Sequence, residues 1–295
     1  MLDIIGKTKV WFTISLILIL IGTGFLFVRH LNFGIDFKGG SVITIEMGKS
    51  FDKEKVETIV KKYASDEVTN TVNRTQLEIK SNSLTEKNFT KMFAEMKKTY
   101  KLKDKALISQ NQIGGTIGAE MTRKALWALV VANLLMLVYI GVRFKEFSFG
   151  FAAIIALIHD LLITISVYAV FHVTVNSPFI AAILTILGYS INDTIVIFDR
   201  IRENNKKLRG RTKEEIGNIS VNETITRSIN TVMTVLITIT AVYFFVPSVR
   251  ELAFPLIIGI VSGAYSSIFI ATPVWVLIKD MQQKHKKKKL AAARA

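Results

Sequence analysis

The sequence contains no cysteine. This absence excludes disulfide bonds and thiolate metal sites, and it suits a protein with a large domain in an oxidising exterior. Residues 41–120 also have no phosphate-binding loop, no zinc-ligand spacing and no nucleophile motif. We therefore expect a chain that is not an enzyme and that uses no cofactor and no metal.

Acidic residues are scarce beside basic ones, with 23 Asp and Glu against 38 Lys and Arg, so the formal net charge is +15. Such an excess can indicate nucleic-acid binding. Here the basic residues lie beside long apolar runs, where the positive-inside rule for membrane proteins accounts for them. We therefore predict no nucleic-acid partner.

Polar sequence is too sparse for an ordinary soluble domain, because half of the residues are hydrophobic. A membrane-spanning helix needs about 20 predominantly apolar residues. The apolar runs predict an α-helical polytopic membrane protein with six transmembrane helices, at residues 10–29, 123–142, 148–171, 178–198, 229–246 and 252–278.

An even number of spans places both termini on one side of the membrane. Lys7, Lys9, Arg143 and the loop that follows the fourth span share that side, whereas the short loops opposite offer only Arg250. Both termini are therefore predicted to be cytoplasmic. No convincing cleavage site follows the first span, which we interpret as an uncleaved signal anchor.

These spans divide the chain into four parts. Residues 1–30 form the first transmembrane helix, 31–121 an extracytoplasmic domain, 122–279 five transmembrane helices with a cytoplasmic loop at 199–228, and 280–295 a basic cytoplasmic tail. For the tail, the anionic headgroups of membrane lipids are the default partner, with ribosomal RNA or no specific partner as alternatives.

The exterior domain alternates in character along its length. Strands are predicted at 41–47, 68–72, 76–80 and 106–112, and amphipathic helices at 52–64 and 85–100, begun by Asp52 and Thr85 as caps. The order strand, helix, strand, strand, helix, strand is that of the α+β ferredoxin-like plan. We expect a protein-contacting module.

Glycines gather where this domain joins the membrane part. Gly34, Gly39 and Gly40 lie on one side of it and Gly114 and Gly115 on the other. Glycine suits a hinge that lets the domain move as a unit, but it equally suits a simple turn between membrane and domain.

Asp193 is an acidic residue inside the fourth predicted span. An ionised Asp near the centre of a membrane helix costs roughly 2.5–3.5 kcal/mol on insertion scales, so it must face protein, pair with a cation or bind a proton. Tyr189 and Ser190 share its helical face, and Asn192 and Thr194 flank it. We interpret Asp193 as a proton-binding site.

Two further groups accompany it. His159 and Asp160 lie near the middle of the third span, either as part of the proton relay or as a structural pair that fixes packing, with Thr164 one turn on as a partner for Asp160. Arg227 heads a hydroxyl stripe in the fifth span, either as a partner of Asp193 or as a positive-inside anchor.

Two motifs resemble the SecD/SecF family of protein-export membrane proteins, which is related to the RND transporters. They are Gly-Ile-Asp-Phe-Lys-Gly-Gly-Ser at 34–41 and the segment 188–204, with Asn192-Asp193 at its centre. The one-span, exterior-domain, five-span layout and the His159–Asp160 pair extend the resemblance over the chain. Relatives often carry Gly-Pro ahead of the second span, where this chain has Gly114-Gly115.

The resemblance implies six helices of RND type in the bacterial cytoplasmic membrane and use of the proton motive force to promote export of unfolded proteins. The implied partners are SecD as the complementary half, the SecYEG channel, YajC, YidC and the unfolded substrate protein. In the family, the Asp of the Asn-Asp motif and an Arg at the head of the fifth span are implicated in proton transport. These fall on Asp193 and Arg227.

Two other functions compete with this one. The same six-span unit could be half of an RND-type proton-coupled exporter of small molecules, in which case the exterior domain needs a large apolar pocket. The chain could also be a passive scaffold, in which the buried charges only specify packing.

Overall fold

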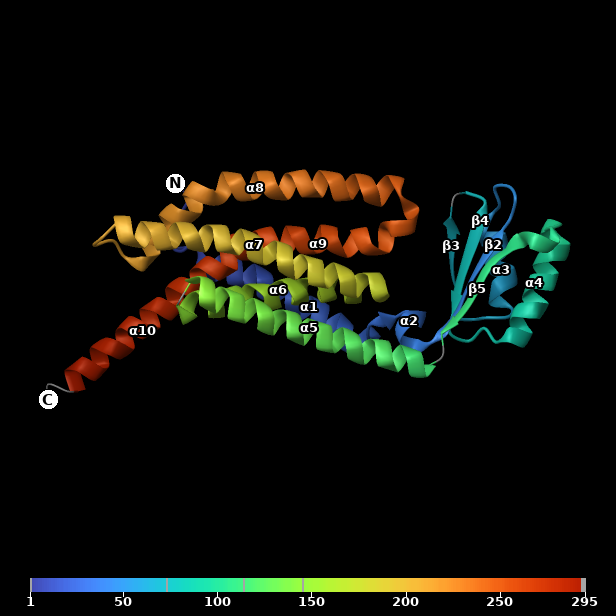
Figure 1. The fold of residues 1–295 in the computed structure, drawn as a ribbon, viewed down its shortest axis with the longest axis horizontal. Coiled ribbons are helices and arrows are strands. Elements are labelled where there is room, and N and C mark those ends of the chain that lie inside the picture. The colour runs from blue at the N-terminus through green and yellow to red at the C-terminus, as the bar shows by residue number, and fades with distance from the viewer. Residues whose placement is uncertain (1, 73, 114, 145, 293–295) are drawn as a thin grey trace.

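The computed structural model describes residues 2–72, 74–113, 115–144 and 146–292, as a helical bundle with a smaller domain at one end (Figure 1). Within this described part, six helical segments are long and apolar enough to cross a membrane, in agreement with the six predicted spans. They comprise α1 (Thr8–Arg29), α5 (Gly115–Phe144), α6 (Phe147–Val170), α7 (Ser177–Lys207), α8 (Lys213–Phe245), and α9 (Arg250–Ser266) continued by a π-helical turn (Ser267–Ala271) and α10 (Thr272–Ala292).

The two helices α7 and α8 extend well beyond the apolar stretches that predicted them. Together they take up most of residues 199–228, which the sequence had suggested as a loop, and only 208–212 separate them. Ion pairs support the polar end of α7, such as Lys207 Nζ to Glu203 Oε1 at 2.6 Å. A capping box of Thr212 and Glu215 starts α8.

The smaller domain has the predicted order of elements. They are β2 (Gly40–Glu46), α3 (Lys53–Lys61), β3 (Val68–Val72), β4 (Gln76–Ser81), α4 (Glu86–Tyr100), a 3-10 turn (Asp104–Ala106) and β5 (Leu107–Ile113). The sheet order is β3-β4-β2-β5 with all neighbours antiparallel. Asp52 and Thr85 cap α3 and α4 as expected, and Phe89, Met92 and Met96 of α4 lie in the core.

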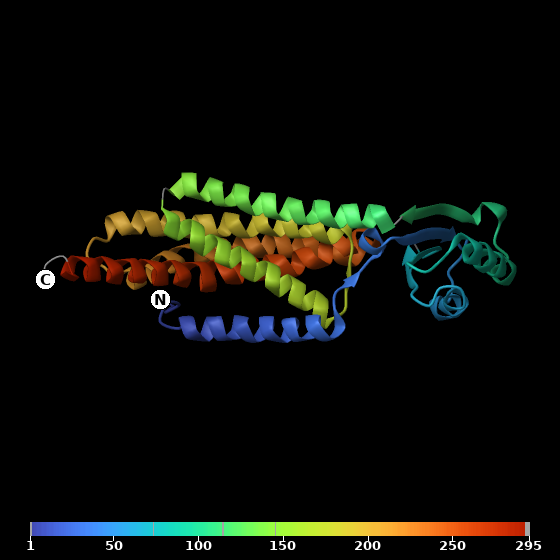
Figure 2. The same ribbon diagram turned by 90° about the horizontal axis from the view of Figure 1, so that it is seen from below.

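Three short elements that the sequence did not predict connect the domain to the bundle. The strand β1 (Asn32–Phe33) pairs in parallel with β6 (Thr174–Val175), and the single helical turn α2 (Ile35–Lys38) follows β1. They join the segment after α1 to the segment between α6 and α7. Both chain ends lie at the far end of the bundle from the domain (Figure 1, Figure 2).

Burial within the bundle is uneven. About half of the apolar window of α6 and of α7 is buried, and 61% of that of the α9–α10 span, against 11% or less in α1, α5 and α8. Trp275 stacks on Phe149 in the core, with ring centroids 5.5 Å apart. The three buried spans therefore form the centre of the bundle, and α1, α5 and α8 present broad apolar faces outward.

Candidate functional site

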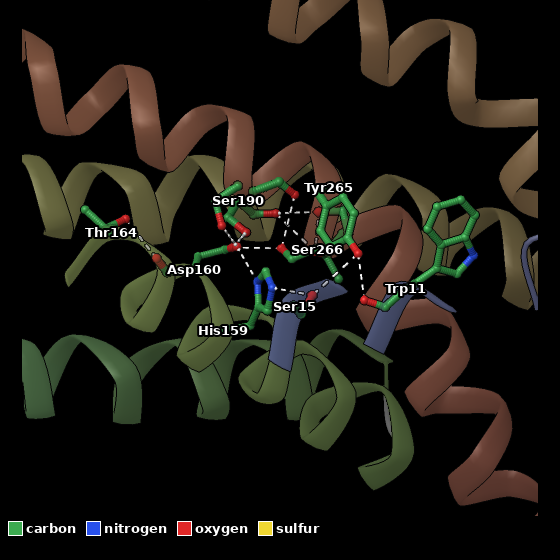
Figure 3. A network of polar contacts seen from close by, with 12 residues as sticks. Trp11, Ser15, His159, Asp160, Thr164, Ser190, Tyr265 and Ser266 are labelled. Carbon is green, nitrogen blue, oxygen red and sulfur yellow. Dashed lines mark hydrogen bonds and ion pairs between the residues drawn. The ribbon is translucent and has the colours of Figure 1, made fainter. Parts of the chain in front are cut away.

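The His159–Asp160 pair lies near the middle of α6, where Figure 3 shows it beside Ser190 of α7 and Ser266 of α9. The Asp160 side chain is fully buried. Its Oδ2 atom accepts hydrogen bonds from Ser190 Oγ at 2.6 Å and Ser266 Oγ at 2.8 Å. Its Oδ1 atom accepts one from Ser262 Oγ at 2.7 Å and lies 3.2 Å from His159 Nδ1.

The His159 ring is bound on both sides. Its Nε2 atom lies 3.0 Å from Ser15 Oγ of α1 (Figure 3). The Ser15 hydroxyl donates to Tyr265 Oη at 3.4 Å, and Tyr265 Oη donates to the Trp11 carbonyl at 2.8 Å. The tautomer of His159 decides which of its two ring nitrogens donates in these contacts. In either tautomer the ring links Ser15 of α1 to Asp160 of α6.

Four partners leave the Asp160 carboxylate fully satisfied. A buried charge is tolerated where it is paired and hydrogen-bonded, and removing a partner is costly. The serines that surround it come from α7 and α9, so the pair also fixes the relative position of α6, α7 and α9. No group of three or more His, Cys, Asp or Glu side chains in the described residues is arranged to hold a metal ion.

Asp193 has a different environment. It lies on α7 and is half-buried, and its Oδ1 atom accepts a hydrogen bond from Ser228 Oγ of α8 at 2.6 Å. Its Oδ2 atom is buried and has no hydrogen-bond partner among the described residues. A buried carboxylate oxygen without a donor disfavours the charged form of the group, and it can be satisfied by taking up a proton.

Arg227 and Asn192 are both exposed on the surface of the chain. Within the described part of the structure the Arg227 guanidinium makes no ion pair with Asp193, although its charge is near enough to act on that carboxylate. The Asn192 side chain makes no recorded contact with it either. Both residues face outward beside Asp193, where a partner protein could cover them.

A line of hydroxyl groups runs from Asp160 to the neighbourhood of Asp193. The Ser190 carbonyl accepts from Thr194 Oγ1 at 3.1 Å and from Ser267 Oγ at 3.3 Å, and the two hydroxyls are 2.8 Å apart. Ser267 begins the π-helical turn, a feature that is frequent at functional sites. The Ser267 side chain is also near enough to Asp193 to act on its carboxylate, so the line leads from Asp160 of α6 through α7 and the π-helical turn toward Asp193.

Three predicted hydroxyl contacts are not found. Thr164 Oγ1 donates to the Asp160 backbone carbonyl instead of its carboxylate, at 2.8 Å. Ser190 binds Asp160 rather than Asp193, and Tyr189 Oη donates to the Thr231 carbonyl at 3.0 Å. The donors that the sequence did not identify are Ser228, Ser262 and Ser266. Gly263 of α9 lies against Ser190 of α7, so the two helices also pack closely at this point.

The glycines between membrane and domain are needed where backbones approach closely. Gly39 has φ 79° and ends α2, and Gly40 has φ 144°, with the Ser81 carbonyl 2.6 Å from where a Cβ atom would lie. Gly34 packs against Asn176, and Gly115 begins α5. Gly114 lies outside the described residues. Movement at these joints stays a prediction.

One ion pair holds the domain to the bundle. Lys80 of β4 contacts Glu251 of α9, with Nζ 2.7 Å from Oε1, and Asn176 Nδ2 donates to Glu251 Oε2 at 2.9 Å. Burial alone would lower the pKa of Lys80. The hydrogen bond to Glu251 and the nearby Glu78 carboxylate outweigh that effect, so the pKa of Lys80 lies above its usual value.

Comparison with known proteins gives consistent results. The family model described as protein export membrane protein SecD/SecF, C-terminal, matches residues 92–281, and that of the SecD/SecF GG motif matches residues 24–50. The protein translocase subunit SecF of Sebaldella termitidis is 36% identical over 98% of this chain and 95% of its own length.

In two longer relatives, nearly all of this chain matches only one part of the relative. The protein translocase subunit SecDF of Bacillus subtilis is 34% identical over 96% of this chain, which spans 39% of that relative. The crystal structure of SecDF from Thermus thermophilus, described as a translocon-associated membrane protein, aligns with a TM-score of 0.81 and 32% identity, over 95% of this chain and 39% of that one. A SecDF structure in a super-membrane-facing form gives a TM-score of 0.75.

Proposed function

The chain belongs to the SecD/SecF family of protein export membrane proteins, and on that premise we propose that it is the SecF-type subunit of a bacterial protein translocase. It is a multi-pass membrane protein. In the proposal it resides in the cytoplasmic membrane with both termini in the cytoplasm, and it pairs with a SecD-type chain as its complementary half. The SecYEG channel, YajC and YidC are the further partners.

The fused relatives support the pairing. This chain corresponds to about two fifths of the SecDF proteins, so a related unit in those chains accounts for part of the remainder. The outward position of Arg227 and Asn192 beside Asp193 suggests where the complementary half covers this one. The exterior domain is assigned to the ferredoxin-like plan on its strand order, and to the extracytoplasmic side because it lies opposite the chain ends.

In the proposed mechanism Asp193 gains and loses a proton as the proton motive force drives protons across the membrane. The observation that carries this is the buried Asp193 Oδ2 atom without a donor, beside an oxygen bound by a single hydroxyl. Approach of Arg227 favours the charged form, and a dry apolar contact favours the neutral form. The His159–Asp160 pair holds α6, α7 and α9 together at the other end of the hydroxyl line.

The energy available per proton fits a modest conformational step. One charge that moves through 100 mV releases about 2.3 kcal/mol. That is enough to shift the exterior domain between two orientations and so to hinder backsliding of an unfolded substrate. Relatives that bear the translocase name count against the alternative of a small-molecule exporter.

The test is proton flux through vesicles that contain this chain with its complementary half. Asp193→Asn keeps the shape of the side chain and its bond to Ser228 but cannot cycle a proton, so flux should fall to the background of empty vesicles. Asp199→Asn is the matched control, since Asp199 lies near the end of the same helix and pairs with Arg143 at 2.6 Å. Native flux in Asp193→Asn would refute the proposal.

A further inference from the structure

A cavity of about 470 Å³ opens sideways between α1, α6 and α9, within the range of about 300–1,000 Å³ that is usual for ligand sites. Its floor lies beside His159, near the middle of α6, and therefore at the depth of the hydrocarbon core rather than of the headgroups. The wall is mostly aliphatic, and it is formed by Ile14, Leu18, Ile163, Ile257, Ile258 and Val261.

The polar groups in the floor have their partners inside the protein. Ser15 donates to Tyr265, Tyr265 donates to the Trp11 carbonyl, and His159 lies between Ser15 and Asp160 (Figure 3). Ser262 donates to Asp160. The floor therefore has little to offer a charged or strongly hydrogen-bonding ligand, and what remains to be contacted is aliphatic.

The contents of such a cavity follow from its surroundings. Water is a poor occupant because it needs two to four polar partners. An empty space is also unfavourable, since the side chains that line it lose their dispersion contacts. The liquid on the outer side is lipid hydrocarbon, because the outward face of α1 is exposed and apolar.

We propose that this cavity binds the acyl chain of a membrane phospholipid. The chain enters past Val261, which is 51% exposed, and lies along the isoleucines with its end beside His159. It thereby keeps water away from the His159–Asp160 pair and fills the space between α1 and α9. The proposal does not depend on proton transport by Asp193.

The experiment uses the full chain in phospholipid vesicles, alone and with its complementary half. The probe is a phospholipid with a photoreactive diazirine at the middle of one acyl chain, and mass spectrometry locates the label. Ile163 and Ile257 should be labelled about tenfold more than Leu135 and Val138, exposed residues of α5 outside the cavity. Val261→Trp, which fills the mouth, should lower labelling at Ile163 to the level of α5.

Leu135→Trp is the matched control, because it adds the same bulk on an exposed face of α5 and should leave labelling at Ile163 unchanged. Native mass spectrometry gives a second readout, in which a retained phospholipid should be lost in Val261→Trp and kept in Leu135→Trp. Equal labelling of α6 and α5 would overturn the proposal. So would labelling that disappears when the complementary half is added, since a protein helix would then be the occupant.

Discussion

Asp160 and Asp193 are both carboxylates within membrane-spanning helices, but they differ in how many donors they have. Three serine hydroxyls and His159 surround Asp160, whereas in the described part of the chain Asp193 has one close donor, Ser228, with the Ser267 side chain near enough to act on it. A fully hydrogen-bonded charge contributes to a fixed structure, while a carboxylate with an unmatched oxygen can change its protonation at little cost. From this difference we infer a structural role for Asp160, and it supports the proposed transport role of Asp193.

This contrast predicts unequal effects of the same substitution on stability. Asp160→Asn replaces an oxygen that accepts hydrogen bonds with an amide group that cannot accept them, so a buried serine donor loses its partner and the free energy of unfolding should fall by about 1–3 kcal/mol. Asp193→Asn should change it by less than about 1 kcal/mol, because the amide oxygen still accepts from Ser228. Thermal unfolding of the two variants in the same detergent measures the difference. Equal melting temperatures would contradict it.

The sequence could identify these carboxylates because charge inside an apolar run is rare. It could not identify their donors. Serine occurs throughout membrane helices, and which face of α8 or α9 meets α7 depends on tertiary packing. Ser228 lies next to Arg227, whose charge made it the more obvious candidate partner of Asp193. Ser190 shares a face with Asp193 but donates its hydrogen bond to Asp160.

At the scale of elements, the close crossing of α2 and α5 fixes where the chain leaves and re-enters the bundle. A Cβ atom at Gly118 would lie 2.5 Å from the Phe37 carbonyl oxygen. Backbone rather than a flexible side chain would be displaced, so even a small residue at this position forces the two elements apart.

Gly118→Val should therefore lower the free energy of unfolding by about 1–3 kcal/mol and increase hydrogen exchange in α2. Gly141→Val is the matched control, since it places the same side chain on α5 at a position with nothing within 4 Å of the added Cβ. Its effect on the free energy of unfolding should be within about 0.5 kcal/mol. Similar exchange rates in both variants would show that the crossing is not tight.

The helices and strands of the smaller domain were predictable, because the alternation of apolar and polar residues and the helix caps are signals from residues close together in the sequence. β3 has the predicted bounds, and the ends of the other strands differ by one residue. The polar extensions of α7 and α8 were not predictable. A search for apolar runs stops where the charged residues begin, and the ion pairs beyond that point depend on how the charged residues are spaced along the helix. The two-residue strands β1 and β6 could not be predicted either, because each forms only by pairing with the other, which is distant in sequence.

For the whole molecule, Lys80 and Glu251 form a contact between the smaller domain and the bundle. It lies beside a cleft of about 640 Å³ between β3 and the turn before α9. Because Glu251 is 40% exposed, the pair contributes only about 1 kcal/mol to docking. In the proposed mechanism, the energy from one proton is enough to break a contact of that size.

Lys80→Gln should broaden the distance distribution between spin labels on Asn70 and Ser248, which line opposite sides of this cleft. The chain has no cysteine, so two introduced cysteines can be labelled cleanly. Lys62→Gln, which breaks the Lys62–Glu95 pair inside the domain, is the control and should leave the distribution narrow. An unchanged distribution in Lys80→Gln would mean that other contacts hold the domain.

The same contact predicts a pH dependence. The pKa of Lys80 is raised by docking, so its contribution is complete below the unfolded value of about 10.4 and is lost as pH rises through the higher docked value. The native distance distribution should stay narrow from neutral pH to about pH 10 and broaden only above that. Broadening that begins near neutral pH would point to a different group.

The tight crossing at Gly118 has a mechanical consequence for the domain. The segment that leaves α1 is paired to β6 and bound at Asp36 by the Ser177 N–H, and the returning segment presses against it at Phe37. The two segments therefore restrain each other where they join the smaller domain to the bundle. In the proposed mechanism this restraint limits the directions in which the domain can move against a passing polypeptide.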